Sequence, residues 1–408
     1  MHRGIEFWPS GLMSKATIHV GTSGWLYKHW RGTFYPKGIK QKEEFEYYSL
    51  FFNTVELNNP FYRLPSRETF ENWRKNSRPD FLYIVKASRY ITHMKKLNET
   101  EDALDLFLHN CSGLEDKLGP ILFQLPPGWE LNIERFEKFL KSLPQGFRFA
   151  FEFRNTTWYH KDVYKLMKQY NCAFCIYQLA GHMSPIEVTA DFVYLRLHGP
   201  TKNKYQGSYD FATLRYWADM SNEWKAAGKD VFIYFDNDDS GYAAFNAQVI
   251  EMMLNKDEPI TQQETDVLAL VISAIKQRKL VEFYYESDNG TIGWRKVEPY
   301  LVAVKNKGRG NIFFTGYVHP GEEIKRRKNN DDQGQYLLNK IDIKRFKISE
   351  EVFDSIKVKE EKIFGALPSV RVVYRTSVRK IEIPGNTLKQ LPAKSIKKSG
   401  TARKRSKK

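Results

Sequence analysis

Short apolar runs of β-prone residues alternate with amphipathic stretches along the first 254 residues of the chain. The amphipathic stretches carry apolar residues at helical spacing, so each predicts a helix between two strands. Alternating strands and helices predict an α/β fold with a parallel sheet, because crossover helices are what join parallel strands. We expect eight strands, which begin at Ile18, Asn53, Phe81, Ile121, Phe149, Ala173, Phe192 and Val231.

The number of units distinguishes among α/β folds. Eight strand–helix units in roughly 240 residues match a closed (β/α)8, TIM-like barrel better than an open doubly wound sheet. An open sheet stays the alternative. A dinucleotide-binding sheet is disfavoured, because the G-T-S-G at Gly21–Gly24 is a weak signal without the rest of that fingerprint. We therefore expect a barrel over residues 16–254.

The pattern changes after Leu254. A polar segment over 255–265 predicts a linker, and the run DVLALVISAIKQR after it predicts a helix. The runs VEFYYES, WRKVEPYLVAV and NIFFTGYV are separated by the turn sequences DNG and KNKGRG, and YLLNKIDIKRFKIS follows a charged loop. Such spacing is typical of antiparallel hairpins. The sequence therefore predicts a small β module over 266–350. Further strands of unassigned packing are expected over 351–393, at the runs SVRVVYRT and RKIEIPG.

Positive charge is concentrated at the end of the sequence. The 408 residues carry a formal net charge of +16, and residues 394–408 hold eight Lys or Arg side chains and no acidic one. Such a run predicts a disordered basic arm, and nucleic acid is the most common partner of such an arm, here through Arg403, Lys404 and Arg405. The alternative is a tail that only keeps the protein in solution.

Cysteine content and the lack of apolar spans both predict a cytoplasmic protein. Three cysteines, Cys111, Cys172 and Cys175, are too few for a disulfide framework, so we expect reduced thiols. Cys172 and Cys175 form a C-x-x-C in a predicted strand, where a spacing of three places them on opposite faces, which favours a structural role. No apolar run is long enough to cross a bilayer and the first residues lack a secretory signal, so no membrane partner is expected.

Alternation along the predicted barrel strands separates side chains that face the helices from those that face the interior. Outward positions must be apolar because helices cover them, which assigns Val55 and Leu57 outward and Glu56 inward. The interior polar groups fall late in their strands, at the carboxyl ends where barrel enzymes hold their active sites. The same reasoning assigns to the interior Thr54, Asn58, Lys86, Ser88, Glu152, Arg154, Tyr194, Arg196 and His198.

These interior groups combine acids with bases. The two glutamates are candidates for general acid–base catalysis, while Arg154 and Arg196 are candidates for recognising a phosphate or carboxylate. A metal ion is disfavoured because the neighbouring cations would repel it, and no cofactor is assigned. The alternative is a structural ion-pair network that fills the barrel, since buried charges need partners. We predict a catalytic set made of Glu56, Lys86, Glu152 and His198.

Further polar and aromatic residues lie at or just past the predicted strand ends. The polar ones are candidates for binding a small anionic substrate, although loop residues of these types are often incidental. The aromatic ones either stack on a base or sugar or pack the loops together. The substrate-binding candidates are Asn58, His93, Gln124, Arg154, Arg196 and Asn237. The aromatic residues are Trp25, Tyr27, Trp30, Tyr35, Phe61 and Tyr62.

The predicted barrel resembles the YecE-like family, called domain of unknown function 72. The resemblance spans about Ile18 to Leu254 and rests on the ordered motifs GTSGWLYKHW, FNTVELNNPFYRLP, VKASRYITH, GPILFQLPP, FEFRNTTW, LRLHG and YFDND. It implies a TIM-like barrel without an established reaction. The motif positions of the family correspond here to Glu56, Lys86, His93, Gln124, Glu152, Arg154, His198 and Asn237.

The C-terminal module resembles a WYL domain over about 266–348, through AIKQRKLVEFYYES, GWRKVEPYLVAV and YLLNKIDIKRFKI. The resemblance implies an SH3-like β-barrel, often regulatory, that senses nucleotide or nucleic-acid ligands. This chain departs from the family at the name-giving Trp-Tyr-Leu, where it has Ile312–Phe314, and it carries Lys340 where an arginine is typical. The contacts that the resemblance implies are Arg295, Tyr300 and Lys305.

We therefore expect a barrel enzyme, a hydrolase or lyase, that acts on a small anionic, phosphorylated or nucleic-acid-derived substrate. A WYL-like module that binds nucleic acid or a nucleotide is expected to be coupled to it. The alternative is a non-enzymatic sensor, in which the barrel binds a small molecule and the basic module tethers the protein to nucleic acid.

Overall fold

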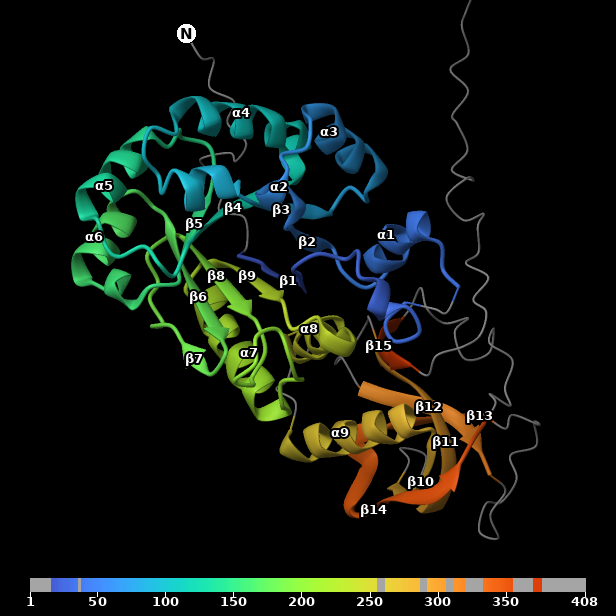
Figure 1. Cartoon of the computed structure of the whole chain (residues 1–408). Coiled ribbons are helices and arrows are strands. Elements are labelled where there is room, and N and C mark those ends of the chain that lie inside the picture. The colour runs from blue at the N-terminus through green and yellow to red at the C-terminus, as the bar shows by residue number, and fades with distance from the viewer. Residues whose placement is uncertain are drawn as a thin grey trace, which may run out of the picture.

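Figure 1 shows the structure of the chain, a computed structural model. It describes residues 16–35, 38–254, 261–286, 292–305, 312–319, 333–354 and 370–375. The predicted basic arm over 394–408, with Arg403, Lys404 and Arg405, lies outside the described residues, and so does the run RKIEIPG. Both of these predictions stay predictions.

The N-terminal part is a nearly closed, barrel-like sheet of eight parallel strands within the described residues. Its hydrogen-bonded order is β1-β9-β8-β6-β5-β4-β3-β2, and the two-residue β7 (His182–Met183) pairs antiparallel with β6. The α/β class and the parallel sheet are confirmed, and the arrangement is consistent with a TIM-like barrel. The eight strands are β1 (Ile18–Thr22), β2 (Thr54–Leu57), β3 (Leu82–Lys86), β4 (Leu118–Leu125), β5 (Phe149–Phe153), β6 (Ala173–Leu179), β8 (Phe192–Leu197) and β9 (Asp230–Phe235).

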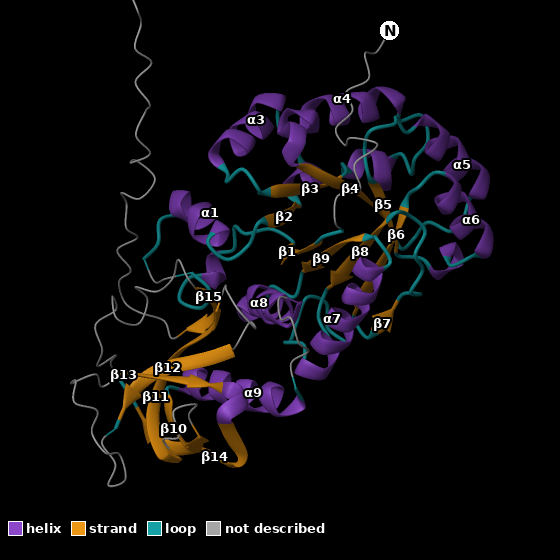
Figure 2. Cartoon of the chain, turned by 180° about the vertical axis from the view of Figure 1, so that it is seen from behind, coloured by secondary structure: helices purple, strands orange, loops and turns teal. Residues whose placement is uncertain are grey.

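Helices surround this sheet in both views (Figure 1, Figure 2). α5 shows why they form there: Asn132 caps its first turn by accepting from the Arg135 N–H at 2.9 Å, and Phe136 and Phe139 are buried on one side. No helix in the described ranges is long and apolar enough to cross a membrane. The helices are α1 (Gln41–Ser49), α2 (Asn59–Tyr62), α3 (Arg67–Asn76), α4 (Glu101–Cys111), α5 (Ile133–Ser142), α6 (Lys161–Gln169), α7 (Phe211–Ala226) and α8 (Tyr242–Leu254).

β1 and β2 are the two ends of the hydrogen-bonded strand order, which runs from β1 through β9 and on to β2. These two end strands contact each other and form the seam of the nearly closed barrel. Gly21 permits the approach, because a Cβ atom there would lie 2.5 Å from the carbonyl oxygen of Thr54. The hydroxyl of Tyr48 joins the strands, since it accepts from the Thr22 N–H at 3.1 Å and donates to the Thr54 carbonyl at 3.0 Å. A single bridge pairs the residue after β1 with Glu56. The seam therefore ends at a predicted site residue.

The predicted facing of the strand residues is confirmed. Val55 and Leu57 of β2 belong to the apolar core between the sheet and its helices. A second, smaller apolar core holds inward-facing residues such as Ile84 and Tyr194. Toward the carboxyl ends of the strands the inward positions become polar, and Glu56 is among them. The fold therefore gathers the polar groups at one end of the barrel.

All three cysteines are free and buried. Cys172 belongs to the outer core and Cys175 to the inner one, which confirms that the C-x-x-C pair faces opposite ways. Burial raises the pKa of Cys111, raises that of Cys172 to about 12, and raises that of Cys175 well above its usual value. The thiols therefore stay protonated at neutral pH, as structural cysteines do.

The C-terminal part is an antiparallel sheet, as the hairpin pattern predicts. Its order is β13-β12-β11-β10-β14, and β15 pairs with β11. β15 corresponds to the run SVRVVYRT. The order establishes an antiparallel sheet, whereas the SH3-like closure stays a prediction. The strands are β10 (Lys279–Glu286), β11 (Ile292–Lys305), β12 (Ile312–Val318), β13 (Gln333–Leu337), β14 (Ile341–Val352) and β15 (Val370–Arg375).

The helix before this sheet begins earlier than the apolar pattern suggests. α9 (Gln262–Gln277) starts after Thr261, whose hydroxyl accepts from the Glu264 N–H at 3.1 Å. In return the Glu264 carboxylate accepts from the Thr261 N–H at 2.9 Å. This capping box satisfies two N–H groups that the helix would otherwise leave open. Residues 262–265 are therefore helical, and the predicted linker over 255–265 is too long.

The two parts of the chain pack against each other. Phe51, just after α1, packs against an apolar cluster of the C-terminal part that includes Leu280, Tyr300 and Phe353. β15 contacts α8, and the two lie close together in both views (Figure 1, Figure 2). Val267 of α9 belongs to the same continuous core as the outer face of the barrel sheet. The C-terminal part is therefore docked on the barrel through apolar contacts.

Candidate functional site

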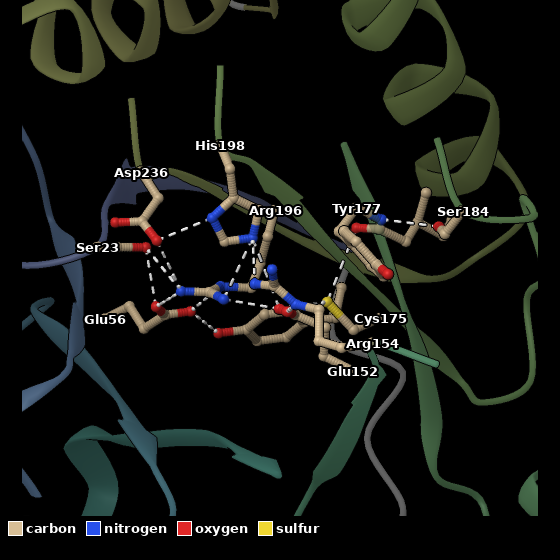
Figure 3. A network of polar contacts seen from close by, with 12 residues as sticks. Ser23, Glu56, Glu152, Arg154, Cys175, Tyr177, Ser184, Arg196, His198 and Asp236 are labelled. Carbon is tan, nitrogen blue, oxygen red and sulfur yellow. Dashed lines mark hydrogen bonds and ion pairs between the residues drawn. The ribbon is translucent and has the colours of Figure 1, made fainter. Parts of the chain in front are cut away.

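Arg196 of β8 lies at the centre of a polar cluster at the carboxyl ends of the strands (Figure 3). Its guanidinium donates to Glu56 from Nε at 2.9 Å and from Nη2 at 2.6 Å, and to Glu152 from Nη1 at 2.6 Å. The arginine is 1% exposed and both carboxylates 0%. Burial would lower the pKa of Arg196, but Glu56 and Glu152 outweigh burial and raise it. This bidentate pairing is what a buried cation requires.

Glu56 is saturated with hydrogen bonds. Besides the two bonds from Arg196, it accepts one from the Ser23 hydroxyl at 2.8 Å and one from the Tyr194 hydroxyl at 2.7 Å. A carboxylate with four donors and no exposure is fixed in place. Its observed contacts therefore suit holding Arg196 better than exchanging protons with a substrate.

Glu152 of β5 also lies between cations. It accepts from Arg154 as well as from Arg196, and the Cys175 thiol donates to it at 3.8 Å. Burial would raise the pKa of Glu152, but Arg154 and Arg196 outweigh burial and hold it well below its usual value. Glu152 is therefore ionised at neutral pH and has no proton to give as an acid.

His198 and Asp236 complete the cluster (Figure 3). His198 Nδ1 lies 2.9 Å from Asp236 Oδ2, and its Nε2 lies 3.2 Å from Arg154 Nη2 and 3.3 Å from Arg196 Nη1. Because an arginine can only donate, these contacts assign the lone pair to Nε2 and the proton to Nδ1. Burial would raise the pKa of Asp236, but the bond to His198 and the charge of Arg196 lower it. Asp236 thus orients the ring as a carboxylate.

Lys86, at the end of β3, has very different surroundings. Its Nζ has no hydrogen bond and no ion pair with any residue in the described ranges, and it lies 4.4 Å from the centre of the Phe61 ring. Burial, reinforced by the charge of Arg196, lowers the pKa of Lys86 to about 8. A partly buried cation without a protein partner is expensive, so this amine is the strongest candidate for a ligand contact.

His93 lies near Lys86 and belongs to a single turn of π-helix, Tyr90–Met94. Its ring stands edge-on to Phe61 with 5.0 Å between the ring centres, and its Nδ1 lies 2.9 Å from the Thr92 hydroxyl. Burial, then the charge of Lys86, lowers the pKa of His93 to about 4. His93 is therefore neutral at pH 7 and flanks the Lys86 amine without adding charge to it.

Two other substrate-binding candidates, Asn58 and Gln124, end their strands near this edge. The Oδ1 atom of Asn58 is buried and has no hydrogen-bond partner among the described residues, although Asn58 stands at the start of α2, where an asparagine often caps. Gln124 is partly buried and is in register with Glu152 on the neighbouring strand. Both positions therefore border the cluster without belonging to its hydrogen-bond network.

Asn237 makes its hydrogen bonds outside the cluster, and the residue past β9 that belongs to the cluster is its neighbour Asp236. The Asn237 amide donates to the Gly207 carbonyl and to Asn246 Oδ1, both at 2.8 Å, which uses both of its N–H bonds. Asp236 continues the inward alternation of Tyr234, whose ring lies in the inner core. The alternation rule therefore contained the signal for Asp236, and Asn237 follows the outward phase.

Asp238 was also missed. It is partly buried, its carboxylate lies 3.5 Å from His29 Nε2, and its carbonyl accepts from the Trp30 ring at 3.0 Å. Burial and the nearby charge of Asp236 raise the pKa of Asp238 to about 6. Such a carboxyl can exchange protons near neutral pH. Its position in a loop past β9 gave no periodic signal.

Aromatic rings line one side of the cluster. The Arg154 guanidinium lies 4.9 Å from the centre of the Tyr177 ring, and the side chain is 9% exposed. Tyr205, in the loop after β8, is 40% exposed and stands edge-on to His198 with ring centres 5.7 Å apart. Tyr205 therefore lies beside the buried imidazole while part of its own surface stays exposed.

The aromatic residues after β1 and β2 mostly pack the loops. Trp30 and Tyr35 are buried, and the Tyr35 hydroxyl donates to the Trp25 carbonyl at 2.6 Å. Tyr62 is the exception, since it is 74% exposed. Over the described ranges, no group of three or more His, Cys, Asp or Glu side chains is arranged to hold a metal ion. The cluster carboxylates contact arginines instead.

Of the three contacts implied for the C-terminal module, Arg295 and Tyr300 are buried. Arg295 is buried and donates to the Trp294 carbonyl at 2.9 Å. Tyr300 is fully buried and donates to Glu298 at 2.5 Å. Lys305 ends β11, in register with Val370 of β15. Tyr300 therefore packs in the core of the module.

Comparison with known proteins finds a family match that covers the barrel part of the chain. The family profile described as "Protein of unknown function DUF72" matches residues 19–267. UPF0759 protein YunF of Bacillus subtilis (strain 168) is 27% identical over 269 residues, which covers 58% of this chain and 94% of that protein.

Two solved structures extend this comparison to the fold. A DUF72 family protein from Thermotoga maritima MSB8 is 28% identical with a TM-score of 0.54, covering 59% of this chain and 100% of that one. A DUF72 family protein from Enterococcus faecalis V583 is 19% identical with a TM-score of 0.52, covering 59% and 97%. These relatives correspond in length to the barrel alone.

Proposed function

The chain belongs to the DUF72 family, whose function is unknown, and we propose from the site itself that its barrel is an enzyme for a small anionic substrate. The substrate binds at the carboxyl ends of β2, β3, β5 and β8 through a phosphate or carboxylate group. The reaction is a hydrolysis or a lyase cleavage run by acid–base chemistry. Phosphorylated metabolites and nucleic-acid fragments are the matching substrate classes.

The observation that carries this proposal is the unpartnered Lys86. All three carboxylates of the cluster contact Arg196, which leaves the Lys86 ammonium without a counterion among the described residues. A ligand anion supplies that counterion, and the gain is large because the site is partly shielded from water. Arg154, with its side chain at the edge of the cluster, adds a second cation.

The chemistry follows from groups with separated pKa values. Asp238 has its pKa raised to about 6 and Lys86 has its pKa lowered to about 8. Between these values Asp238 is mainly a base and Lys86 mainly an acid, which is the pairing that acid–base catalysis uses. The network around Arg196 keeps the carboxylates at fixed positions, so the field at the site is preorganised.

The alternative function is a sensor that binds the same anion without turnover. The saturated contacts of Glu56 and the arginine pairing of Glu152 favour it, because these two predicted catalysts are held in place. Product formation separates the two functions, since a sensor binds an anion and leaves it unchanged.

For the C-terminal module we propose contact with nucleic acid through the basic arm over 394–408, as in a WYL-like regulator. The support is the uncompensated charge of that segment in the sequence. Binding to a DNA or RNA oligomer should weaken steeply with salt, and removal of 394–408 should flatten that dependence. Affinity that ignores salt contradicts the proposal.

The proposed barrel function is tested with sulfate, an anion whose charge is constant around neutral pH. Calorimetric titration of the full chain should show sulfate binding that Lys86→Met weakens about tenfold, the effect of one charge-assisted hydrogen bond. Lys141→Met is the matched control, because Lys141 is 60% exposed and pairs with Glu137 on the surface of α5. Affinity should also fall as pH rises through about 8, where Lys86 loses its proton.

A screen of phosphorylated sugars and nucleotides then tests for turnover. We expect product with the wild type and the Lys141→Met variant and none with Lys86→Met. Equal sulfate affinity in wild type and Lys86→Met contradicts an anion site at Lys86. If the wild type binds the phosphorylated compounds tightly but converts none of them to product, the result supports the sensor.

A further inference from the structure

We infer that Lys86 is a nucleophile, and that the anionic substrate carries an aldehyde or ketone carbon with which its amine forms an imine. This inference rests on the proposed function and names the substrate class of that same site. The geometry that points to it is the position of the Lys86 amine. It lies at the end of β3, is partly buried, and has no hydrogen bond or ion pair with any described residue.

Other lysines of this chain show what a structural amine looks like here. Lys117 Nζ donates to the Arg74 carbonyl at 2.8 Å and to the carbonyl and hydroxyl of Ser77 at 2.9 Å. Lys229 Nζ donates to the Ala190 carbonyl at 2.8 Å. The fold therefore satisfies structural lysines with backbone carbonyls, and Lys86 is a contrast to them rather than an example of them.

The surroundings of Lys86 favour the neutral amine that attacks carbon. The face of the Phe61 ring lies 4.4 Å from Nζ, a cation–π contact that stabilises the ammonium less than a carboxylate would and leaves Nζ without a hydrogen bond to a described residue. Glu56 and Glu152 are both taken by Arg196. The pKa of about 8 leaves a usable fraction of free amine near neutral pH, whereas an ordinary lysine is almost wholly protonated.

The proposed step balances without an oxidant or reductant. The Lys86 amine adds to the carbonyl carbon, a C–N bond forms, and a proton moves from nitrogen to the former carbonyl oxygen. The carbinolamine then takes one proton, loses water, and becomes a cationic iminium. In a substrate with a hydroxyl group on the β-carbon, that hydroxyl then loses its proton to a base and the Cα–Cβ bond breaks, so the β fragment leaves as an aldehyde or ketone while the electron pair of the bond moves to the iminium and gives an enamine. Protonation of the enamine carbon and hydrolysis by water release the second product and the Lys86 amine, which completes the lyase reaction among the proposed classes.

Trapping with glyoxylate and borohydride tests the inference, because glyoxylate has an aldehyde beside a carboxylate. Borohydride reduces an imine to a stable secondary amine, and peptide mapping of the full chain locates it. We expect Lys86 to be labelled about tenfold faster than exposed Lys141, because more of it is unprotonated. Labelling of Lys86 no faster than Lys141 overturns the inference.

Two controls separate this inference from the function on which it rests. Lys86→Arg keeps the positive charge but cannot form an imine, so it should still bind sulfate and show no label at position 86. Sulfate should also slow the labelling of wild-type Lys86 by competition. Sulfate binding without trapping refutes the imine alone, whereas the absence of sulfate binding refutes the proposed function.

Discussion

Arg196 and Lys86 are two cations at the same end of one barrel, yet their surroundings are opposite. Arg196 donates to Glu56 and Glu152 at 2.6–2.9 Å and lies 3.3 Å from Asp236, while Lys86 has an aromatic ring 4.4 Å away and no described counterion. Nearby carboxylates raise the pKa of Arg196, and burial lowers that of Lys86 to about 8.

The difference divides the cluster into a centre and an edge. A guanidinium presents several donors in one plane and can satisfy two carboxylates at once, so Arg196 neutralises the centre. What remains for Lys86 is a position beside the carboxylates but outside their hydrogen bonds. The structural ion-pair network expected as an alternative therefore describes the centre, and the edge is where we place the ligand.

The largest effect is expected from Arg196→Met. It leaves Glu56, Glu152 and Asp236 buried together without their shared cation, which should cost about 3–5 kcal/mol of unfolding free energy. Urea unfolding measures this loss. Arg196→Lys keeps the charge but loses the bidentate contact, so it should fall between the wild type and Arg196→Met. A loss below about 1 kcal/mol in Arg196→Met would remove the distinction between centre and edge.

Glu152→Gln should destabilise by roughly 1.5–3 kcal/mol, because it removes a charged acceptor from two arginines. The effect depends on pH, since the folded-state pKa of Glu152 lies well below its unfolded value near 4.5. Its contribution is present above that value and is lost as pH falls through the folded pKa. The gap between wild type and variant in urea unfolding should therefore narrow below about pH 4.5, and a constant gap contradicts it.

Lys86→Met should change stability in the opposite direction, raising it by roughly 1 kcal/mol at pH 7. The folded-state pKa of about 8 lies below the unfolded value of 10.5, so the folded chain holds this proton less tightly. That penalty is present below about pH 8 and fades as pH rises toward 10.5. The advantage of the variant should therefore disappear in alkaline buffer. A destabilised Lys86→Met variant at pH 7 would show an overlooked partner.

The smallest effects separate two asparagines. Asn58→Ala removes a buried oxygen that has no partner, so stability should stay within about 0.5 kcal/mol. Asn237→Ala removes two hydrogen bonds, to Gly207 and Asn246, and should cost about 1–2 kcal/mol. Thermal unfolding of both variants side by side checks the order, and equal losses would place Asn58 in the structural network.

Sequence alternation was enough to bring much of the cluster together. The outward phase of apolar residues identified Glu56, Glu152 and Arg196 as interior, because helices must cover the other face. The same alternation places Asp236 inward, because it lies two residues after the inward-facing Tyr234. Asn237 was predicted instead, because it is a polar residue just past the end of the strand.

Other features could not be predicted from the order of residues along the chain, because they depend on contacts between distant segments. The isolation of Lys86 depends on which carboxylates Arg196 occupies, and those come from β2, β5 and the end of β9. The capping box at Thr261 was legible in the sequence, whereas the seam at Gly21 and Thr54 depends on the distance between two backbones. Which of the predicted charged side chains can still bind a ligand therefore depends on the ion pairs that form in the folded structure.

The most direct test is urea unfolding of wild type, Arg196→Met and Lys86→Met, each with and without sulfate. General exclusion of sulfate from protein surfaces stabilises all three alike, so the added stabilisation that depends on Lys86 is the informative quantity. We predict that Arg196→Met is strongly destabilised, and that Lys86→Met is slightly more stable than the wild type but loses the sulfate response specific to the site. A Lys86→Met variant that unfolds as easily as Arg196→Met and responds to sulfate like the wild type would contradict the account.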